Sequence, residues 1–229
     1  MATRFLFFIL FVASSVCKAQ TINDAGAWLT LSLQYPVSKK TSIVLDQELR
    51  LKENYQRINL FYTNVGIDYK LNKYIKISPT YRSIQKKQLN GNYSYRHRFM
   101  LDVTIKKKIN KFTISERVRY QIEVADFYTS KKGKLAEQFL RLKTDLKYQL
   151  TKKITPYASC EFRFQIRDPK GDGPLYDGEF HRIRNVVGAE YLINKKNAIN
   201  VYYLIQSEFD ISSPEIIYIL GIGYFLTLK

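Results

Sequence analysis

Residues 93–124 read YSYRHRFMLDVTIKKKINKFTISERVRYQIEV, two long runs of alternating apolar and polar residues joined by a short polar turn at 110–111. Side chains on a β-strand point to opposite faces with a period of two, so each run divides into two faces. Phe99 and Leu101 share one face of the first run, and Arg98 lies on the other. The stretch therefore predicts a β-hairpin with one apolar face and one densely charged face.

The same pattern recurs along most of the chain. Eleven strand-like segments alternate in this way, at residues 27–36, 42–53, 58–71, 74–84, 93–106, 112–124, 138–150, 155–167, 181–192, 198–209 and 215–228. Every second connection is a short, lysine-rich turn, at residues 38–40, 72–73, 110–111, 151–153 and 194–196. Long strands joined alternately by tight turns and longer loops are typical of transmembrane β-barrels.

The apolar face of these segments is almost free of charge over about nine to eleven positions, which is the length of a transmembrane β-strand. A soluble propeller is the structural alternative, but a repeat of roughly forty residues would hold four short strands instead of two long ones. We therefore predict an all-β fold: a single antiparallel transmembrane β-barrel of 10–12 strands, with a polar, charged lumen and an apolar, lipid-facing exterior. Because bacterial single-chain barrels have even strand numbers, the eleven segments predict ten or twelve strands.

The N-terminus has the features of a secretory signal peptide. Arg4 supplies a positive charge before the apolar run 5–13, and small residues lead to a cleavage position at Ala19. Residues 1–19 are thus predicted to be the signal peptide and residues 20–229 the barrel, in the outer membrane of a Gram-negative cell. Lipidation of Cys17 is the alternative, disfavoured by the bulky valine before it. No later stretch approaches about 18 consecutive apolar residues, so helical membrane spans are not expected.

The chain is strongly basic, with 37 Lys and Arg, 20 Asp and Glu, and a net charge of +17. In a cytosolic protein this excess of positive charge would indicate that the partner is a nucleic acid. If residues 1–19 are not a signal peptide, the alternative prediction is a basic nucleic-acid-binding β protein. In an exported protein no nucleic acid is expected. The predicted partners are outer-membrane lipids, including lipopolysaccharide phosphates, and small anionic solutes. The sequence does not indicate an oligomeric state.

Several short motifs recur in one family. They are Trp28 early in the first strand, the acidic-to-basic stretch 46–50, the Tyr81-Arg82 pair, the tyrosine–arginine strand 93–98, and the closing stretch 221–226. With these features the chain resembles the domain-of-unknown-function 2490 family of outer-membrane β-barrels from Bacteroidetes-type bacteria. The resemblance covers essentially all of the predicted mature chain. It implies a fold and a location, and it supplies no catalytic residues.

The charged face of the strands is where we expect function. Its candidate lumen residues are Arg96, Arg98, Arg117, Arg119, Arg141, Arg163, Arg167, Arg182, Arg184, Glu48, Asp102, Glu123, Glu161, Glu190 and Glu208. These charges can fill a narrow lumen by pairing with one another, or they can line a channel that favours anions. A barrel of eight strands is filled by side chains, whereas sixteen strands leave an aqueous channel, so ten or twelve strands favour a narrow or plugged lumen over an open pore.

Enzymatic chemistry has little support in the sequence. The two histidines are His97, in the lipid-facing register, and His181, at a strand start beside the acidic loop 168–180. An outer-membrane enzyme of the lipid hydrolase or protease type, with a rim site near His181, is the alternative function. No cofactor motif and no catalytic residues are predicted, and the acidic loop lacks the spacing of an EF-hand, so no metal is expected. The preferred reading is a non-enzymatic barrel, either a structural or binding scaffold or a narrow channel.

Overall fold

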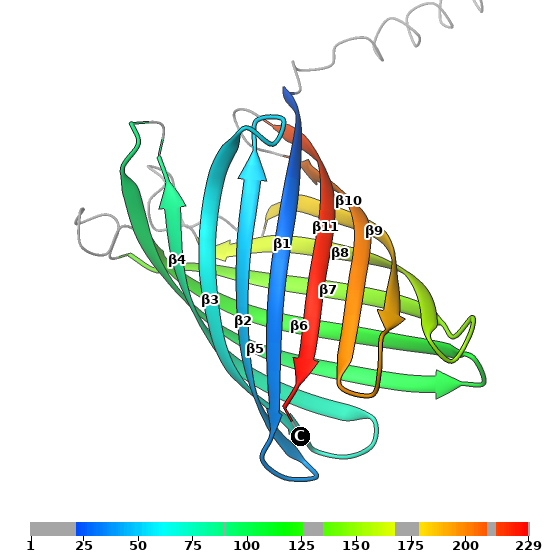
Figure 1. The fold of residues 1–229 in the computed structure, drawn as a ribbon. Helices are drawn as coiled ribbons and strands as arrows, with labels where there is room; N and C mark the ends of the chain where they lie inside the picture. The colour runs from blue at the N-terminus through cyan, green and yellow to red at the C-terminus, as the bar shows by residue number, and fades with distance from the viewer. Residues whose placement is uncertain (1–21, 89, 126–134, 168–178, 210–213, 229) are drawn as a thin grey trace, which may run out of the picture.

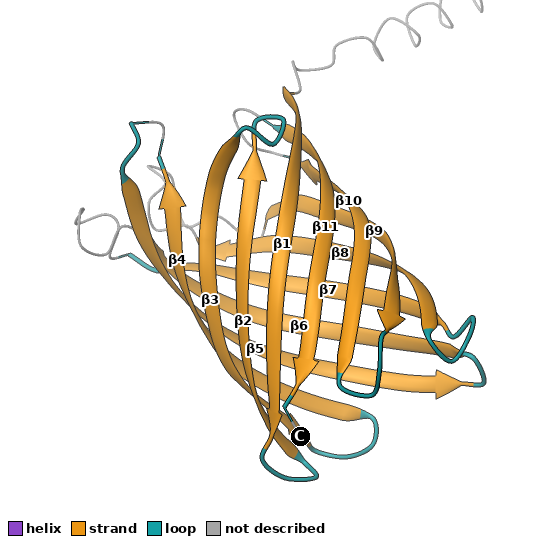
Figure 2. Ribbon diagram, viewed as in Figure 1, coloured by secondary structure: helices purple, strands orange, loops and turns teal. Residues whose placement is uncertain are grey.

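A computed structural model describes residues 22–88, 90–125, 135–167, 179–209 and 214–228. These residues form eleven long strands that wrap into one barrel (Figures 1 and 2). The strands are β1 (Ile22–Pro36), β2 (Thr41–Lys52), β3 (Arg57–Lys70), β4 (Ile75–Lys87), β5 (Tyr93–Ile109), β6 (Phe112–Ala125), β7 (Glu137–Tyr148), β8 (Ile154–Arg167), β9 (Glu179–Leu192), β10 (Asn197–Glu208) and β11 (Glu215–Thr227). In the described part of the chain, no helix is long and apolar enough to span a bilayer.

The barrel closes through a parallel pair. Each strand is antiparallel to its neighbour in sequence, and β1 then pairs with β11 in parallel, from Ile22 opposite Glu215 to Gln34 opposite Thr227. An odd number of alternating strands must close in this way, because the first and last strands run in the same direction. The predicted β-barrel is confirmed, and the eleven segments in the sequence correspond to eleven strands. The adjustment to ten or twelve was wrong, because it applied the parity of most bacterial barrels to a chain that closes differently.

The two faces of the barrel have opposite chemistry. Leu29 and Ile67 point outward and are 43% and 48% exposed, whereas Glu48 and Glu123 point into the lumen and are 6% and 3% exposed. A soluble barrel has the reverse arrangement, with its apolar side chains inside. The strands therefore confirm the predicted charged lumen and apolar exterior, and an apolar outer band of this kind is what a lipid bilayer requires.

The five lysine-rich turns all lie at the same end of the barrel (Figure 1). A short polar side chain organises four of them by accepting backbone hydrogen bonds. The side-chain Oδ1 of Asn72 accepts from the backbone N–H groups of Tyr74 and Ile75 at 2.8 and 2.9 Å, and Ser38, Thr151 and Asn194 act similarly. These local bonds explain why Ser, Thr and Asn precede lysine in the turns.

Three strand pairs contain a register shift. The shifts lie in β2–β3 beside Arg50 and Leu51, in β7–β8 beside Gln138 and Phe139, and in β8–β9 beside Arg163 and Phe164. Each one inserts an extra residue in one strand, so strict alternation is lost locally and a side chain can change face. The second and third shifts lie in neighbouring strand pairs.

Candidate functional site: an arginine-rich lumen

The lumen contains a cavity of about 830 Å³ that is lined by side chains from all eleven strands of the described chain. Most of the predicted lumen residues line it: Glu48, Arg96, Arg98, Arg117, Arg119, Glu123, Arg141, Glu161, Arg163, Arg182, Arg184 and Glu208. Three do not. Asp102 and Glu190 occupy ion pairs beside the cavity, with Arg119 and Lys147 respectively. Arg167 is exposed at the end of β8, beyond the register shift, where it lies opposite Gln138.

Among the carboxylates of the described lumen, Glu161 on β8 pairs with the most arginines. The residue is 6% exposed, and its carboxylate accepts hydrogen bonds from three guanidinium groups on β6, β7 and β9. Arg117 Nη2 lies 2.5 Å from Oε2, Arg184 Nη1 lies 3.3 Å from Oε1, and Arg141 Nη2 also donates to Oε1. A buried carboxylate needs such partners to remain ionised. Glu161 thus joins three strands from inside the barrel.

Two further carboxylates are saturated by arginine. Glu123 Oε2 accepts from Arg98 through Nε at 2.9 Å and Nη2 at 2.6 Å, and its Oε1 lies 3.3 Å from Arg96 Nη1. Asp102 receives two bonds from Arg119, at 2.6 and 2.7 Å. The Arg119–Asp102 pair joins two N–H groups to two oxygens, and such a fork fixes both partners in orientation as well as distance. Glu161, Glu123 and Asp102 are therefore already occupied by arginine.

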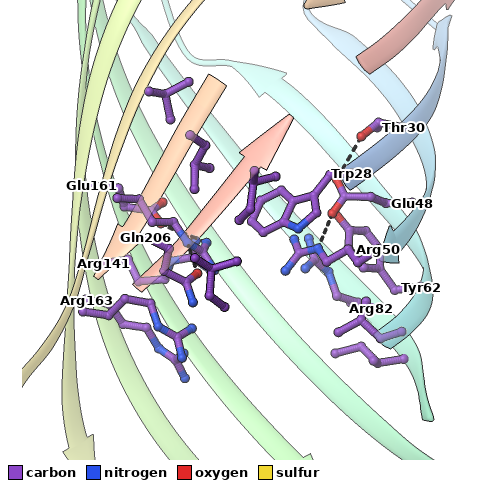
Figure 3. Close-up of a pocket in the computed structure, with 18 of the residues that line it drawn as sticks. Trp28, Thr30, Glu48, Arg50, Tyr62, Arg82, Arg141, Glu161, Arg163 and Gln206 are labelled. Carbon is purple, nitrogen blue, oxygen red and sulfur yellow. Dashed lines mark hydrogen bonds and ion pairs between the residues drawn. The ribbon is translucent and has the colours of Figure 1, made fainter. Parts of the chain in front are cut away.

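A stack of arginines and aromatic rings forms the opposite wall (Figure 3). The guanidinium carbon of Arg50 lies 3.6 Å from the Trp28 ring centroid and 5.4 Å from that of Tyr62. Arg82 lies 3.6 Å from the Tyr62 centroid, and Arg184 lies 5.2 Å from Trp28. Cations are attracted to the faces of aromatic rings. The candidate set omitted this wall, although strand parity alone puts Trp28 beside Thr30, and Tyr62 beside Asn64, on the polar face.

His181 lies inside the lumen, and it lines the cavity rather than the outer rim. Its ring packs on Phe139 with centroids 5.8 Å apart. Asp177 and the side chain of Glu179, the acidic groups of loop 168–180 that are nearest to it in sequence, lie outside the described part of the structure. The other histidine, His97, accepts or donates a 2.7 Å hydrogen bond with the Tyr81 hydroxyl on the outward face. In the described residues, no group of three or more His, Cys, Asp or Glu is placed to hold a metal.

Basic side chains outnumber acidic ones around the cavity. Among the described residues that line it, the basic ones are Arg50, Lys52, Arg82, Lys86, Arg96, Arg98, Arg117, Arg119, Arg141, Lys143, Arg163, Arg182 and Arg184. The acidic ones are Asp46, Glu48, Glu123, Glu137, Glu161, Glu208 and Glu215. The lumen therefore has a clear excess of positive charge, and low-dielectric walls focus the field of such an excess into the enclosed space.

Comparison with known proteins gives a fold and a family. No curated protein matches the chain. The beta domain of the Bordetella autotransporter Brka is 10% identical, with 84% of this chain and 86% of that chain covered and a TM-score of 0.50. A crystal structure of the NanC porin is 11% identical, with 80% and 86% covered and a TM-score of 0.49. The likeness to the autotransporter domain shows that the fold is that of an outer-membrane β-barrel.

A family model covers most of the chain, and its family is the one that the sequence motifs resemble. It matches residues 25–215, from the N-terminal part of β1 to the first residue of β11. The protein thus belongs to the family described as protein of unknown function, DUF2490.

Proposed function

We propose that the protein is a non-enzymatic outer-membrane β-barrel whose lumen takes up small anionic solutes, as a binding scaffold or a narrow channel. The observation that carries this proposal is the presence of lumen arginines without a carboxylate partner. Arg82 is stacked on Tyr62 and donates from Nε to Asn64 Oδ1 at 2.6 Å. Arg163 is stacked on Phe139, with its guanidinium carbon 3.8 Å from the ring centroid. Among the residues whose side chains the structure describes, neither forms an ion pair with a carboxylate.

An arginine that stacks on a ring keeps its N–H edge available for an oxygen ligand, because the contact uses only the flat face of the guanidinium group. The nearby carboxylates are taken by other arginines, as for Glu161 and Glu123. A buried charge without a partner is costly, and a solute that carries negative charge would offset that cost. The lumen thus has the chemistry of an anion-binding site.

The same contacts favour a narrow lumen over a wide pore. Arg184 on β9 reaches Trp28 on β1, and Lys52 on β2 binds Glu215 on β11 at 2.9 Å across the parallel seam. Eleven strands lie between the eight that side chains fill and the sixteen that enclose an aqueous channel. Solutes that pass such a lumen must exchange contacts with arginine side chains, which favours anions.

The barrel is also proposed to contact anionic lipid at the end that carries the short turns. Tyr69 and Tyr74 lie on the outward face near that end and are 41% and 46% exposed. Aromatic residues at this level mark the membrane interface in outer-membrane barrels. The lysines at 39–40 and 152–153 lie just beyond it, where phospholipid or lipopolysaccharide phosphates would be their partners.

Quenching of Trp28 fluorescence tests the proposed anion uptake. Trp28 is the only tryptophan in the sequence and it lines the cavity, so its emission reports on the lumen alone. In detergent-solubilised protein, the anion iodide is expected to quench Trp28 more strongly than the cation caesium does, with neutral acrylamide as the measure of access. Arg82→Gln is expected to weaken iodide quenching and leave acrylamide quenching unchanged. Lys152→Gln, in a turn outside the lumen, is the matched control. Stronger quenching by caesium than by iodide would overturn the proposal.

The non-enzymatic part of the proposal has its own test. Purified protein is incubated with phospholipid and peptide substrates, and no turnover above that of a buffer control is expected. Turnover that His181→Ala abolishes would replace the proposal with the enzymatic alternative.

A further inference from the structure

A bulge in β9 turns His181 into the lumen. Arg163 pairs with Arg182, and the next residue of β8, Phe164, pairs with Phe180, so His181 is the extra residue of β9. Strict alternation would place His181 on the outward face, opposite to Arg182. Instead it lines the cavity beside Arg182, and it is 8% exposed. A bulge that re-aims a side chain in this way is commonly found next to a functional site.

The bulge is held from both sides of the barrel wall. On the outer face, Phe180 packs against Phe162, Phe164 and Phe209, with ring centroids 5.9, 5.6 and 5.4 Å apart. The backbone carbonyl of His181 accepts a hydrogen bond from Phe209 N–H at 2.9 Å. On the inner face, the His181 ring rests on Phe139. The imidazole is therefore fixed in the lumen by packing, and its backbone carbonyl has a hydrogen-bond partner.

His181 and the two arginines beside it each have a buried nitrogen without a hydrogen-bond partner. His181 Nδ1, Arg163 Nε and Arg182 Nε are all buried and form no hydrogen bond. Arg163 stacks on the same Phe139 ring as His181, so the two side chains share an apolar base. Arg182 is bound to Glu208 through Nη2, and its Nε takes no part in that bond. Nearly all buried polar atoms in proteins have a hydrogen-bond partner, so a group of three without one indicates a ligand that supplies the acceptors.

We propose that His181, Arg163 and Arg182 form an oxoanion subsite in the lumen, which binds the carboxylate or phosphate group of a small solute. The inference rests on the proposed function, since it names the group that the cationic lumen selects. Guanidinium groups bind both oxoanions through paired N–H donors. His181, with its proton on Nδ1, supplies a third donor from the bulged strand. Phe139 closes the apolar side of the subsite and keeps water from competing for these donors.

Imidazole NMR of the whole protein in detergent micelles tests the subsite directly. The sequence contains two histidines, and His97 lies on the outward face as an internal control. With ¹⁵N-labelled histidine, we expect inorganic phosphate or acetate to shift the His181 signals saturably and to leave the His97 signals in place. Sodium chloride at matched ionic strength should leave both residues unchanged. Saturation with phosphate alone assigns a phosphate group, and saturation with acetate alone assigns a carboxylate.

Two arginines of β8 provide matched variants. Arg163→Gln should weaken the anion response of His181 by about tenfold, since charge-assisted hydrogen bonds to one arginine are lost. Arg167→Gln removes the same charge from an exposed position outside the cavity and should leave the response unchanged. Arg163→Lys keeps the charge without the planar fork and should give an intermediate loss, which separates recognition from folding.

The outcomes distinguish this subsite from the broader proposal. If iodide quenches Trp28 preferentially and His181 does not respond to either oxoanion, the subsite is overturned and anion uptake by the lumen stands. If His181 responds equally in the wild type and in Arg163→Gln, the assignment of Arg163 is wrong and the subsite as proposed fails. If neither Trp28 nor His181 responds to anions, both proposals fail.

Discussion

Replacement of Glu161 by glutamine should destabilise the barrel more than any other single loss of a carboxylate in the described lumen. The change keeps the shape of the side chain and removes a charge that three arginines share. At an effective dielectric of about 20, one ion pair at about 4 Å contributes about 4 kcal/mol before desolvation. Removing one partner of a buried pair costs about 3–5 kcal/mol, because the other charge stays buried without compensation. We expect a loss in that range.

The free energy of unfolding is measured by denaturant titration of the reconstituted barrel, with Trp28 emission as the signal. Glu53→Gln is the control, because it removes a carboxylate from an exposed ion pair. Glu53 Oε1 lies 2.5 Å from Arg57 Nη2, and the Glu53 side chain is 46% exposed. Exposed pairs contribute about 0–1 kcal/mol, so this control should be close to the wild type. Equal stabilities for the two variants would refute the view that Glu161 holds β6, β7 and β9 together.

Two other variants test the packing of the lumen and the orientation of the outer face. Gly221→Ala should lower the free energy of unfolding by about 1–3 kcal/mol through overpacking, because a Cβ there would lie 1.9 Å from Cζ of Tyr202. Most of that loss should vanish in a Tyr202→Ala background. An unchanged loss in that background would contradict the contact. A spin label can be attached to Cys160 in a Cys17→Ser background. In bilayers, oxygen should relax this label more than a water-soluble nickel complex does, because Cys160 points away from the lumen. Stronger relaxation by the nickel complex would mean that this face meets water.

Strand positions could be predicted well from the sequence because alternation and turn chemistry are both local. The strand predicted at 93–106 corresponds to β5, Tyr93–Ile109, in the structure. It ends where Asn110 adopts a positive φ of 53° in the two-residue turn. The first strand was predicted at 27–36 and begins earlier, at Ile22. Residues 22–26 show no clear alternation, and their partner is β11, at the far end of the chain. Only the closed barrel reveals that pairing.

The candidate site was predictable as far as alternation holds. Arg117 and Arg163 face the lumen, as the alternation of faces along their strands predicts. No register shift lies between either residue and the centre of its strand. Arg167 leaves the cavity and His181 enters it at the two neighbouring bulges, and a bulge depends on pairing between strands rather than on a local residue pattern. Ion pairs across several strands, such as Arg117 with Glu161, depend on the curvature of the barrel and are likewise absent from the sequence pattern.

The reversal potential in a planar lipid bilayer under a potassium chloride gradient tests the cationic lumen most directly. The structure predicts a conductance that is small or absent, and any current should reverse toward the chloride equilibrium potential. Joint replacement of Arg117 and Arg163 by glutamine should move the reversal potential toward zero in a barrel that still folds, because both glutamines keep hydrogen-bonding groups in the lumen. A large conductance that reverses toward the potassium equilibrium potential would contradict both the narrow lumen and its positive charge.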